Sequence, residues 1–199
     1  MAAVRRLKRE FREIAASSPQ ELGFELTCKN PNDMTKLNAT IFGPSDSPYA
    51  GGKFELSIDV PLEYPFRPPK ISFISKVWHP NISSATGCIC LDILKDNWSA
   101  GYTLRTTLLS IIALLTVPEP DDPQDGVVAA MFKKSRKDFD TTATFWTSVF
   151  ANGNEIPEQD HLKDKVRQFK QINGIDDEKQ AVILLSNNNW DIHKASKQI

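Results

Sequence analysis

The stretch HPNISSATGCICLDIL, residues 79–94, decides how this chain is interpreted. It follows neither the period of a helix nor that of a strand, and it contains two of the three cysteines, Cys88 and Cys90. An irregular stretch of this length inside a compact domain is more often functional than idle. We therefore expect this segment to carry the chemistry and the elements on either side of it to form its scaffold.

The cysteines show no disulfide or metal framework. Their number is odd and their spacing is irregular, which argues against a disulfide scaffold. A Cys-x-Cys pair could begin a metal site, but the histidines supply no second ligand pair at zinc spacing: they are His79, His161 and His193. We expect no metal, and we expect Cys28 and Cys88 to be small packing residues.

Before the central stretch, four segments alternate apolar and polar residues, over 24–28, 37–41, 54–60 and 71–73. Turn signals at 30–33, 43–46 and 61–69 separate them. Short connections favour an antiparallel meander with one buried face. Apolar residues at helical spacing predict a helix over 3–16, which could cover that face. Its arginines form either a solvated surface or a docking surface for an acidic partner.

After the central stretch the pattern becomes helical. Helices are predicted over 103–115, 125–136 and 138–151, and the breakers in 151–157 mark a domain boundary. Three short helices are then predicted over 159–172, 177–186 and 189–198, the last opened by Trp190. The prediction is an α/β (α+β) core domain over 1–153, a linker over 154–158 and a compact three-helix domain over 159–199.

Composition excludes some partners. The 199 residues carry a formal net charge of −1 and are 40% apolar, so nothing global indicates nucleic acid or an anionic membrane surface. No apolar run approaches the ~20 residues of a membrane span, and the basic, amphipathic N-terminus lacks the apolar stretch of a signal peptide. A cytoplasmic protein, also able to occur in the nucleus, is the expectation.

The motifs of the chain resemble those of the ubiquitin-conjugating enzymes. That family's signature is His-Pro-Asn, a short loop and Ile-Cys-Leu-Asp, as in residues 79–92 here. Supporting motifs follow the family order across residues 3–150: Tyr64-Pro65-Phe66-x-Pro68-Pro69, Trp98 and Pro120-Asp121-Asp122-Pro123. The strings at 44–52 and 119–125, with the tail, are similar to the twenty-five-kilodalton class related to huntingtin-interacting protein, which has a C-terminal ubiquitin-associated domain.

The resemblance implies a function and a set of partners. The enzyme would accept ubiquitin from the ubiquitin-activating enzyme as a thioester, then pass it to a lysine of a protein substrate with the help of ubiquitin ligases. The implied product is a chain linked through lysine 48 of ubiquitin. No cofactor is expected, because the activating enzyme consumes the ATP and no phosphate-cradling loop is present. Two alternatives remain open, namely conjugation of another ubiquitin-like modifier and a non-enzymatic ubiquitin-binding scaffold.

The resemblance also assigns catalytic residues. Cys90 matches the acyl carrier, and a thiolate suits this role because it is both nucleophile and leaving group. The donor is already a thioester, so no base is required, and His79 with Pro80 is expected to support the loop. Asn81 either donates to the oxyanion of the lysine step or only holds the loop. Asp122 and Asp92 would orient the lysine amine. In the alternative interpretation, Asp122 is only part of a turn that stops a helix.

Docking residues follow in the same way. The resemblance places contacts to the activating enzyme and to ligases at Arg5, Arg6, Arg9, Phe66 and Ser99. The second ligase loop has the sequence Ser99-Ala100-Gly101, where the family usually has Ser-Pro-Ala. This difference argues against the ordinary mode of ligase docking at this loop. Leu109 matches the helix position against which the donor ubiquitin packs.

The tail departs from its own family's binding motif. Ubiquitin-associated domains usually bind through a Met-Gly-Phe or Met-Gly-Tyr loop, and this chain has Asn173-Gly174-Ile175. A complete methionine-sized contact is worth ~1.5–3 kcal/mol. We predict that the three-helix fold is kept while ubiquitin binding is weak or lost.

Overall fold

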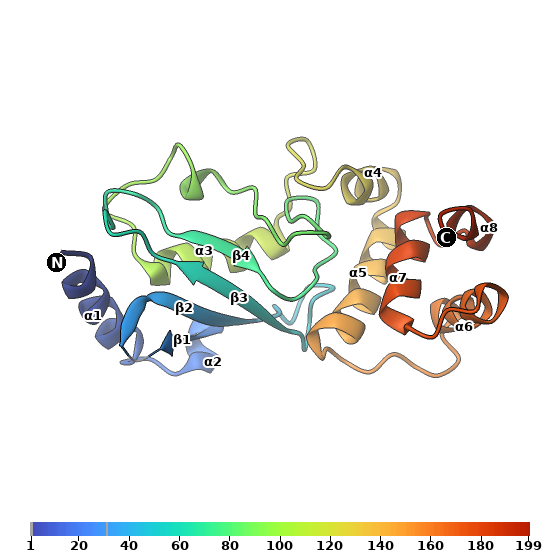
Figure 1. Ribbon diagram of the computed structural model, residues 1–199, viewed down its shortest axis with the longest axis horizontal. Coiled ribbons are helices and arrows are strands. Elements are labelled where there is room, and N and C mark those ends of the chain that lie inside the picture. The colour runs from blue at the N-terminus through green and yellow to red at the C-terminus, as the bar shows by residue number, and fades with distance from the viewer. Residues whose placement is uncertain (1, 31) are drawn as a thin grey trace.

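The structure, a computed structural model, describes residues 2–30 and 32–199; Pro31, in the predicted turn between the first two strands, lies outside them. The first half contains α1 (Ala2–Ile14), α2 (Pro19–Leu22), β1 (Phe24–Asn30), β2 (Asp33–Phe42), β3 (Lys53–Asp59), β4 (Lys70–Phe73) and the 3₁₀ turn η1 (Asp92–Leu94). The helices α3 (Leu104–Thr116), α4 (Gly126–Lys134), α5 (Arg136–Ala151), α6 (His161–Asn173), α7 (Glu178–Asn187) and α8 (Ile192–Ser196) follow (Figure 1).

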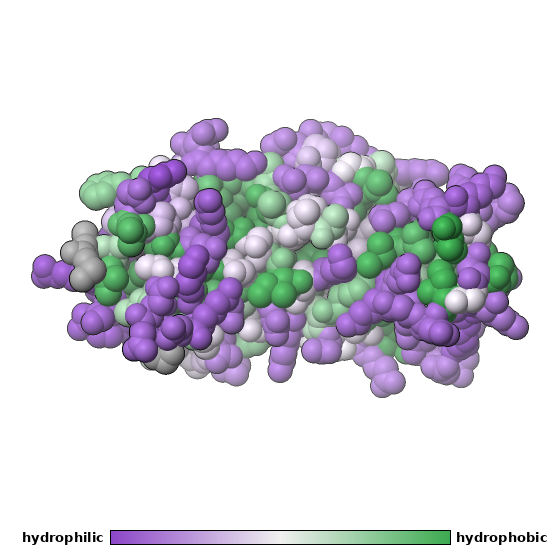
Figure 2. All heavy atoms as spheres, in the orientation of Figure 1, coloured by the Kyte–Doolittle hydropathy of each residue, from purple (hydrophilic) through white to green (hydrophobic). Residues whose placement is uncertain are grey.

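The sheet is an antiparallel meander in the order β1-β2-β3-β4, which confirms the predicted fold class. Leu37 pairs with Ile58 and Ile41 pairs with Phe54, and all four side chains are fully buried on one face. Since side chains alternate along a strand, the polar residues between them share the opposite face. Figure 2 shows that the side of the molecule seen in Figure 1 is mostly hydrophilic, with smaller apolar patches between.

Helix α3 supplies much of the packing against the buried face. Four of its side chains are at most 2% exposed and belong to the same core cluster as the strands: Leu104, Leu108, Ile111 and Leu115. Helix α1 contacts β2 and α3 at one end of this core, and α5 contacts β3. The predicted cover by the N-terminal helix is therefore incomplete, because α3 and α5 share that role.

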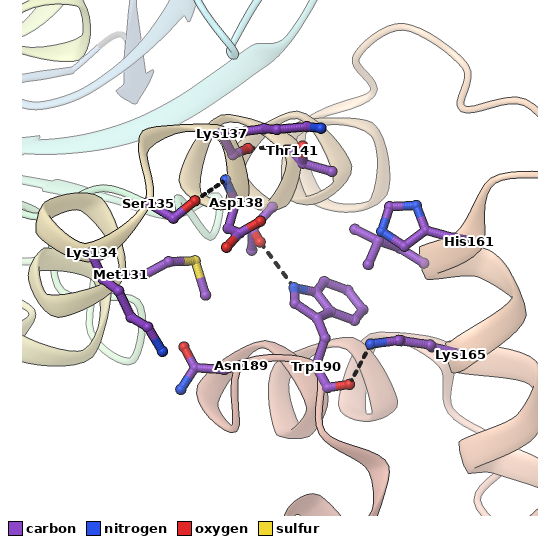
Figure 3. A pocket seen from close by; sticks show the side chains of 12 residues that line it. Met131, Lys134, Ser135, Lys137, Asp138, Thr141, His161, Lys165, Asn189 and Trp190 are labelled. Carbon is purple, nitrogen blue, oxygen red and sulfur yellow. Dashed lines mark hydrogen bonds between the residues drawn. The ribbon is translucent and has the colours of Figure 1, made fainter.

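The tail packs onto the core domain through α5. Helices α6–α8 lie at the end of the molecule opposite α1 (Figure 1), and α7 contacts α5. The side chain of Trp190 crosses this seam: its Nε1 donates to Thr142 Oγ1 at 2.9 Å and its ring packs edge-on against Phe145. Figure 3 shows the indole pointing toward α5 beside a cavity of about 400 Å³.

The predicted helix over 189–198 is wrong at its start. Asn189 and Trp190 have φ values of 54° and 60°, in the left-handed region that a helix cannot use, and α8 begins at Ile192 behind an Asp191 N-cap. The physical reason is the packing of the tail on α5: with this backbone conformation the Trp190 ring contacts Thr142 and Phe145 of α5. The residue thus joins the tail to the core domain instead of opening a helix.

Candidate active site

The central stretch folds back on itself and holds Cys90 by its backbone. Isolated bridges pair His79 with Ile82 and Ile82 with Ile89, and the Cys90 N–H donates to the Asn81 carbonyl at 2.8 Å. The turn requires Gly87, whose φ is 75° and whose added Cβ would lie 1.9 Å from the Phe73 carbonyl oxygen. Cys90 is left half-buried.

Two charged side chains reach the sulfur of Cys90 from different segments. Asp122 Oδ2, in the loop before α4, lies 3.8 Å from Sγ. Lys95, at the end of η1, places its Nζ 3.3 Å from Sγ and donates to it. An ammonium group there stabilises the negative charge that develops on sulfur when a thioester breaks. Sequence reasoning missed Lys95, although its position five residues after Cys90 was available as a signal.

Cys88 and Cys28 differ from Cys90 in their surroundings. Cys88 is exposed and Cys28 is half-buried against the core. Cys28 therefore only partly fits the prediction of a core residue, and the exposure of Cys88 does not fit that of a packing filler. Neither lies beside the carboxylate and ammonium that meet at Cys90.

Asn81 is almost fully buried and uses its whole amide to hold the Asp122 loop. Its Nδ2 donates to the carbonyls of Glu119 at 2.8 Å and of Asp122 at 3.0 Å. Its Oδ1 accepts from the Glu119 N–H at 2.8 Å. Because both amide hydrogens already have acceptors, this geometry favours the loop-holding alternative over direct donation to an oxyanion.

His79 and Pro80 also hold the segment around Asn81 and the Asp122 loop in place. His79 Nε2 lies 2.9 Å from the Leu114 carbonyl and Nδ1 accepts from the Asn81 N–H at 3.0 Å. The Pro80 carbonyl accepts from the N–H groups of Gln124 and Asp125. Because the imidazole is fully buried and both of its nitrogens bond to backbone groups, its arrangement is that of a structural support.

We expect the buried His79 to make the fold sensitive to acid. Burial lowers its pKa from 6.5 to about 4, against a smaller opposing effect of the Leu114 carbonyl. Above pH 6.5 the imidazole is neutral in both states, so stability is fully present. Below it only the unfolded chain binds the proton, and the free energy of unfolding should fall by about 2 kcal/mol by pH 5 and about 3 kcal/mol near pH 4.

Urea unfolding at pH 7 and pH 5 measures this loss, with His79→Gln as the variant that lacks the titrating group. The variant should start less stable and lose less on acidification. An equal loss in both proteins would show that His79 is not the source.

Asp92 lies next to the sulfur in sequence but is engaged locally. Its oxygens accept from the Ile93 N–H at 2.7 Å and from Asn97 Nδ2 at 2.8 Å. The side chain is exposed, and these bonds hold the turn that carries Lys95. Its contribution in this arrangement is to shape η1.

The predicted docking residues lie on three neighbouring segments and differ in exposure. Arg5 and Arg9 are exposed on α1, Phe66 is 80% exposed, and Ser99 is exposed in the loop before α3. Arg6 is different: its side chain is 19% exposed and donates to Glu10 and to the Tyr102 carbonyl. Arg6 is therefore committed to an internal bond network. Leu109, on α3, is 39% exposed.

The buried carboxylate of Glu10 connects those three segments. We call Glu10 and its partners Arg6, Tyr64 and Leu104 the Glu10 junction. Glu10 is 1% exposed and accepts from the Tyr64 hydroxyl at 2.8 Å and from the Leu104 N–H at 2.8 Å, besides Arg6. Burial and the Glu10 carboxylate raise the pKa of Tyr64, so the phenol stays protonated and donates. Sequence reasoning missed this junction.

In the tail, the loop predicted to bind ubiquitin is partly consumed by internal bonds. Asn173 Nδ2 donates to the Phe169 carbonyl at 2.9 Å and to Ser196 Oγ at 3.0 Å. Gly174 ends α6 with a left-handed φ of 65°, and Ile175 is half-buried. The Asn173 side chain therefore ties α6 to α8 and presents little apolar surface.

Within residues 2–30 and 32–199, no group of three or more potential metal ligands comes together. In the same part of the chain, no helix combines the length and the apolar character needed to cross a membrane.

Comparison with known proteins adds the family. Residues 6–147 match the ubiquitin-conjugating enzyme family model, and residues 163–196 match that of a UBA-like (ubiquitin-associated-like) domain. The Drosophila melanogaster ubiquitin-conjugating enzyme E2-22 kDa is 50% identical over 98% of this chain and 96% of its own length. The Homo sapiens ubiquitin-conjugating enzyme E2 K is 45% identical over the same shares.

A solved structure agrees with the fold and with these relatives. The E2 domain of a ubiquitin conjugating enzyme of Toxoplasma gondii superposes with a TM-score of 0.68 at 47% identity, covering 74% of this chain and 97% of that one. The site holds a thiol beside a carboxylate and an ammonium group. The chain therefore belongs, by its sequence and its fold, to the ubiquitin-conjugating enzyme family: it is an enzyme of ubiquitin transfer, and a UBA-like domain follows its conjugating domain.

Proposed function

We propose that Cys90 is the thiol that carries ubiquitin and that Asp122 assists its transfer to the acceptor lysine. The observation that supports this is the meeting of three segments at Sγ, where Asp122 approaches to 3.8 Å and Lys95 to 3.3 Å. No other cysteine of the described chain has both partners.

The two steps use these groups in turn. In the first, the Cys90 thiolate attacks the thioester carbonyl of ubiquitin on the activating enzyme, and that enzyme's thiolate leaves. In the second, a lysine amine attacks the new thioester, the C–S bond breaks and its electron pair returns to Cys90 Sγ beside the Lys95 ammonium. The amine's proton passes to the Asp122 carboxylate or to water. Asn81 keeps Asp122 in place through both steps.

A charging assay tests the carrier. With activating enzyme, ubiquitin and ATP, wild type should form an adduct on a non-reducing gel that a reductant removes. The adduct should be lost in Cys90→Ala and kept in Cys88→Ala. An adduct that persists in Cys90→Ala would refute the assignment.

The product we propose is a polyubiquitin chain linked through lysine 48 of ubiquitin, supported by the string at 119–125 that resembles the twenty-five-kilodalton class. Chain synthesis should stop with a ubiquitin in which that lysine is replaced by arginine. Charging with several modifiers and their activating enzymes separates ubiquitin from other ubiquitin-like proteins, since only the accepted one forms the Cys90 adduct.

We further propose that partners dock on the surface formed by Arg5, Arg9, Phe66 and Ser99. The exposure of these side chains supports contact with the activating enzyme and with ligases. Arg6 supports that surface from beneath. The exposed side of Leu109 would pack against donor ubiquitin.

The tail should bind ubiquitin weakly, and restoring apolar contact should strengthen it. We expect small chemical-shift changes at residues 173–175 on ubiquitin titration of wild type. The double variant Asn173→Met with Ile175→Phe should bind on the order of tenfold to a hundredfold more tightly, given ~1.5–3 kcal/mol for a complete contact. Tight binding of wild type centred on these residues would contradict the prediction.

A further inference from the structure

A groove is lined by the end of β3, by β4 and by residues on either side of Cys90 in the sequence; we call it the β3–β4 groove. It has a volume of about 790 Å³ and its floor is apolar, with contributions from Val60, Pro69, Ile71 and Ile89. These four residues are buried members of the fold, so the floor is fixed. A volume of this size lies within the range of ligand-binding clefts.

The rim of this groove is strongly cationic. Its lining residues include four cations, Lys36, Arg67, Lys70 and Lys95, and one carboxylate, Asp59. Asp59 lies in register between Lys36 and Lys70 and pairs with Lys36 at 3.1 Å. Lys36 is thus neutralised, and Arg67 pairs with Glu63 at 3.6 Å. The remaining lining cations are Lys70 and Lys95, and Lys95 also donates to Cys90 Sγ.

The groove is connected to the reacting atom through Lys95, although its own lining contains Cys88 and not Cys90. Lys95 lines it and also donates to Cys90 Sγ at 3.3 Å. A segment seated on the floor therefore brings its own side chains next to a thioester on Cys90. Such proximity raises the rate of attack by a lysine of that segment.

The chemistry of the lining favours a peptide over a nucleic acid. The groove has cations but no aromatic ring on which a base would stack, and the whole chain has a net charge of −1. An apolar floor with a basic rim complements an extended segment that alternates apolar and acidic residues.

We propose that the β3–β4 groove binds the acceptor segment of a protein substrate and selects lysines flanked by aspartate or glutamate. This rests on Cys90 as the ubiquitin carrier. Carboxylates of the segment pair with Lys70, and its lysine amine attacks the thioester carbonyl. The C–N bond forms, the C–S bond breaks, the electron pair returns to sulfur and the amine proton goes to Asp122 or water.

Discharge of a preformed ubiquitin thioester tests the selection. The acceptors are free lysine and two peptides of equal length with one lysine each, flanked by glutamates in one and by arginines in the other. Wild type should use the glutamate peptide with a kcat/KM about tenfold higher than the arginine peptide, and salt should shrink the difference.

Lys70→Glu should remove or reverse this preference while leaving discharge to free lysine unchanged. Lys53→Glu is the matched control: it makes the same charge change at an exposed β3 position that does not line the groove, and it should keep the preference. Equal use of both peptides by wild type, or equal effects of the two variants, would overturn the proposal. A thioester that still forms in Cys90→Ala would instead overturn the carrier assignment on which the proposal rests.

Discussion

Asn81→Ala should charge with ubiquitin almost normally and transfer it to lysine on the order of 100-fold more slowly. The substitution removes three partly buried hydrogen bonds to the Glu119–Asp122 loop, each worth about 1–3 kcal/mol when a buried partner is left unsatisfied. The loop then no longer holds Asp122 at the sulfur. Charging is spared because exchange between thioesters needs no acid or base group. Single-turnover discharge of preformed thioester to free lysine measures the effect.

The two alternatives for Asn81 differ in what happens to the loop. If Asn81 acts by holding it, the Glu119 N–H, which now bonds to Asn81 Oδ1, should exchange with solvent much faster in Asn81→Ala. Asn81→Asp keeps that acceptor but loses both donors, so it should protect the Glu119 N–H and still fail in transfer. Unchanged exchange in Asn81→Ala, together with slow transfer, would instead indicate direct donation to the oxyanion.

Trp190→Ala should release the tail from the core domain. The indole is 6% exposed and combines an edge-on contact with Phe145 and a hydrogen bond to Thr142 across the seam. Loss of a buried tryptophan side chain typically costs ~3–5 kcal/mol. We expect the seam to open and the tail to unfold at lower denaturant than the core domain, giving two transitions and rapid proteolysis between α5 and α6, which includes the predicted linker over 154–158.

Thr142→Val is the graded control for the seam. It removes only the hydrogen bond of the indole and should weaken docking by about 1 kcal/mol. Charging of Cys90 should persist in both variants, because the catalytic segments pack within the core domain. A single unfolding transition at the wild-type midpoint in Trp190→Ala would show that the seam contributes little.

The regular elements were predictable because burial of one face imposes a period on the sequence. The burial of Leu37 and Ile58 in the sheet follows from an alternating pattern, and the buried residues of α3 follow from a helical one. Trp190 could not be placed in this way. A helical pattern assumes right-handed backbone, whereas the left-handed turn at Trp190 accompanies a contact with α5, distant in sequence.

The residues of the site that belong to a sequence motif could be predicted, whereas those that only the fold brings to the site could not. Cys90, Asn81 and Asp122 came from the resemblance, and the structure brings them together through Pro80 and the loop it anchors. Lys95 was missed because its reach to the sulfur depends on how η1 turns. Glu10 looked like one charge among many on α1, since its burial is created by Tyr64 and Leu104, which lie far along the chain.

The Glu10 junction has a consequence for how partner binding should be dissected. One carboxylate joins α1, the segment preceding Phe66 and the start of α3, and Trp98 Nε1 further ties the Ser99 loop to the Pro65 carbonyl at 2.8 Å. Residues that share such a network do not contribute independently. Alanine substitutions at Arg9, Phe66 and Ser99 should therefore give binding free energies that do not sum, and partners that touch only one of the three segments should still sense changes in the other two.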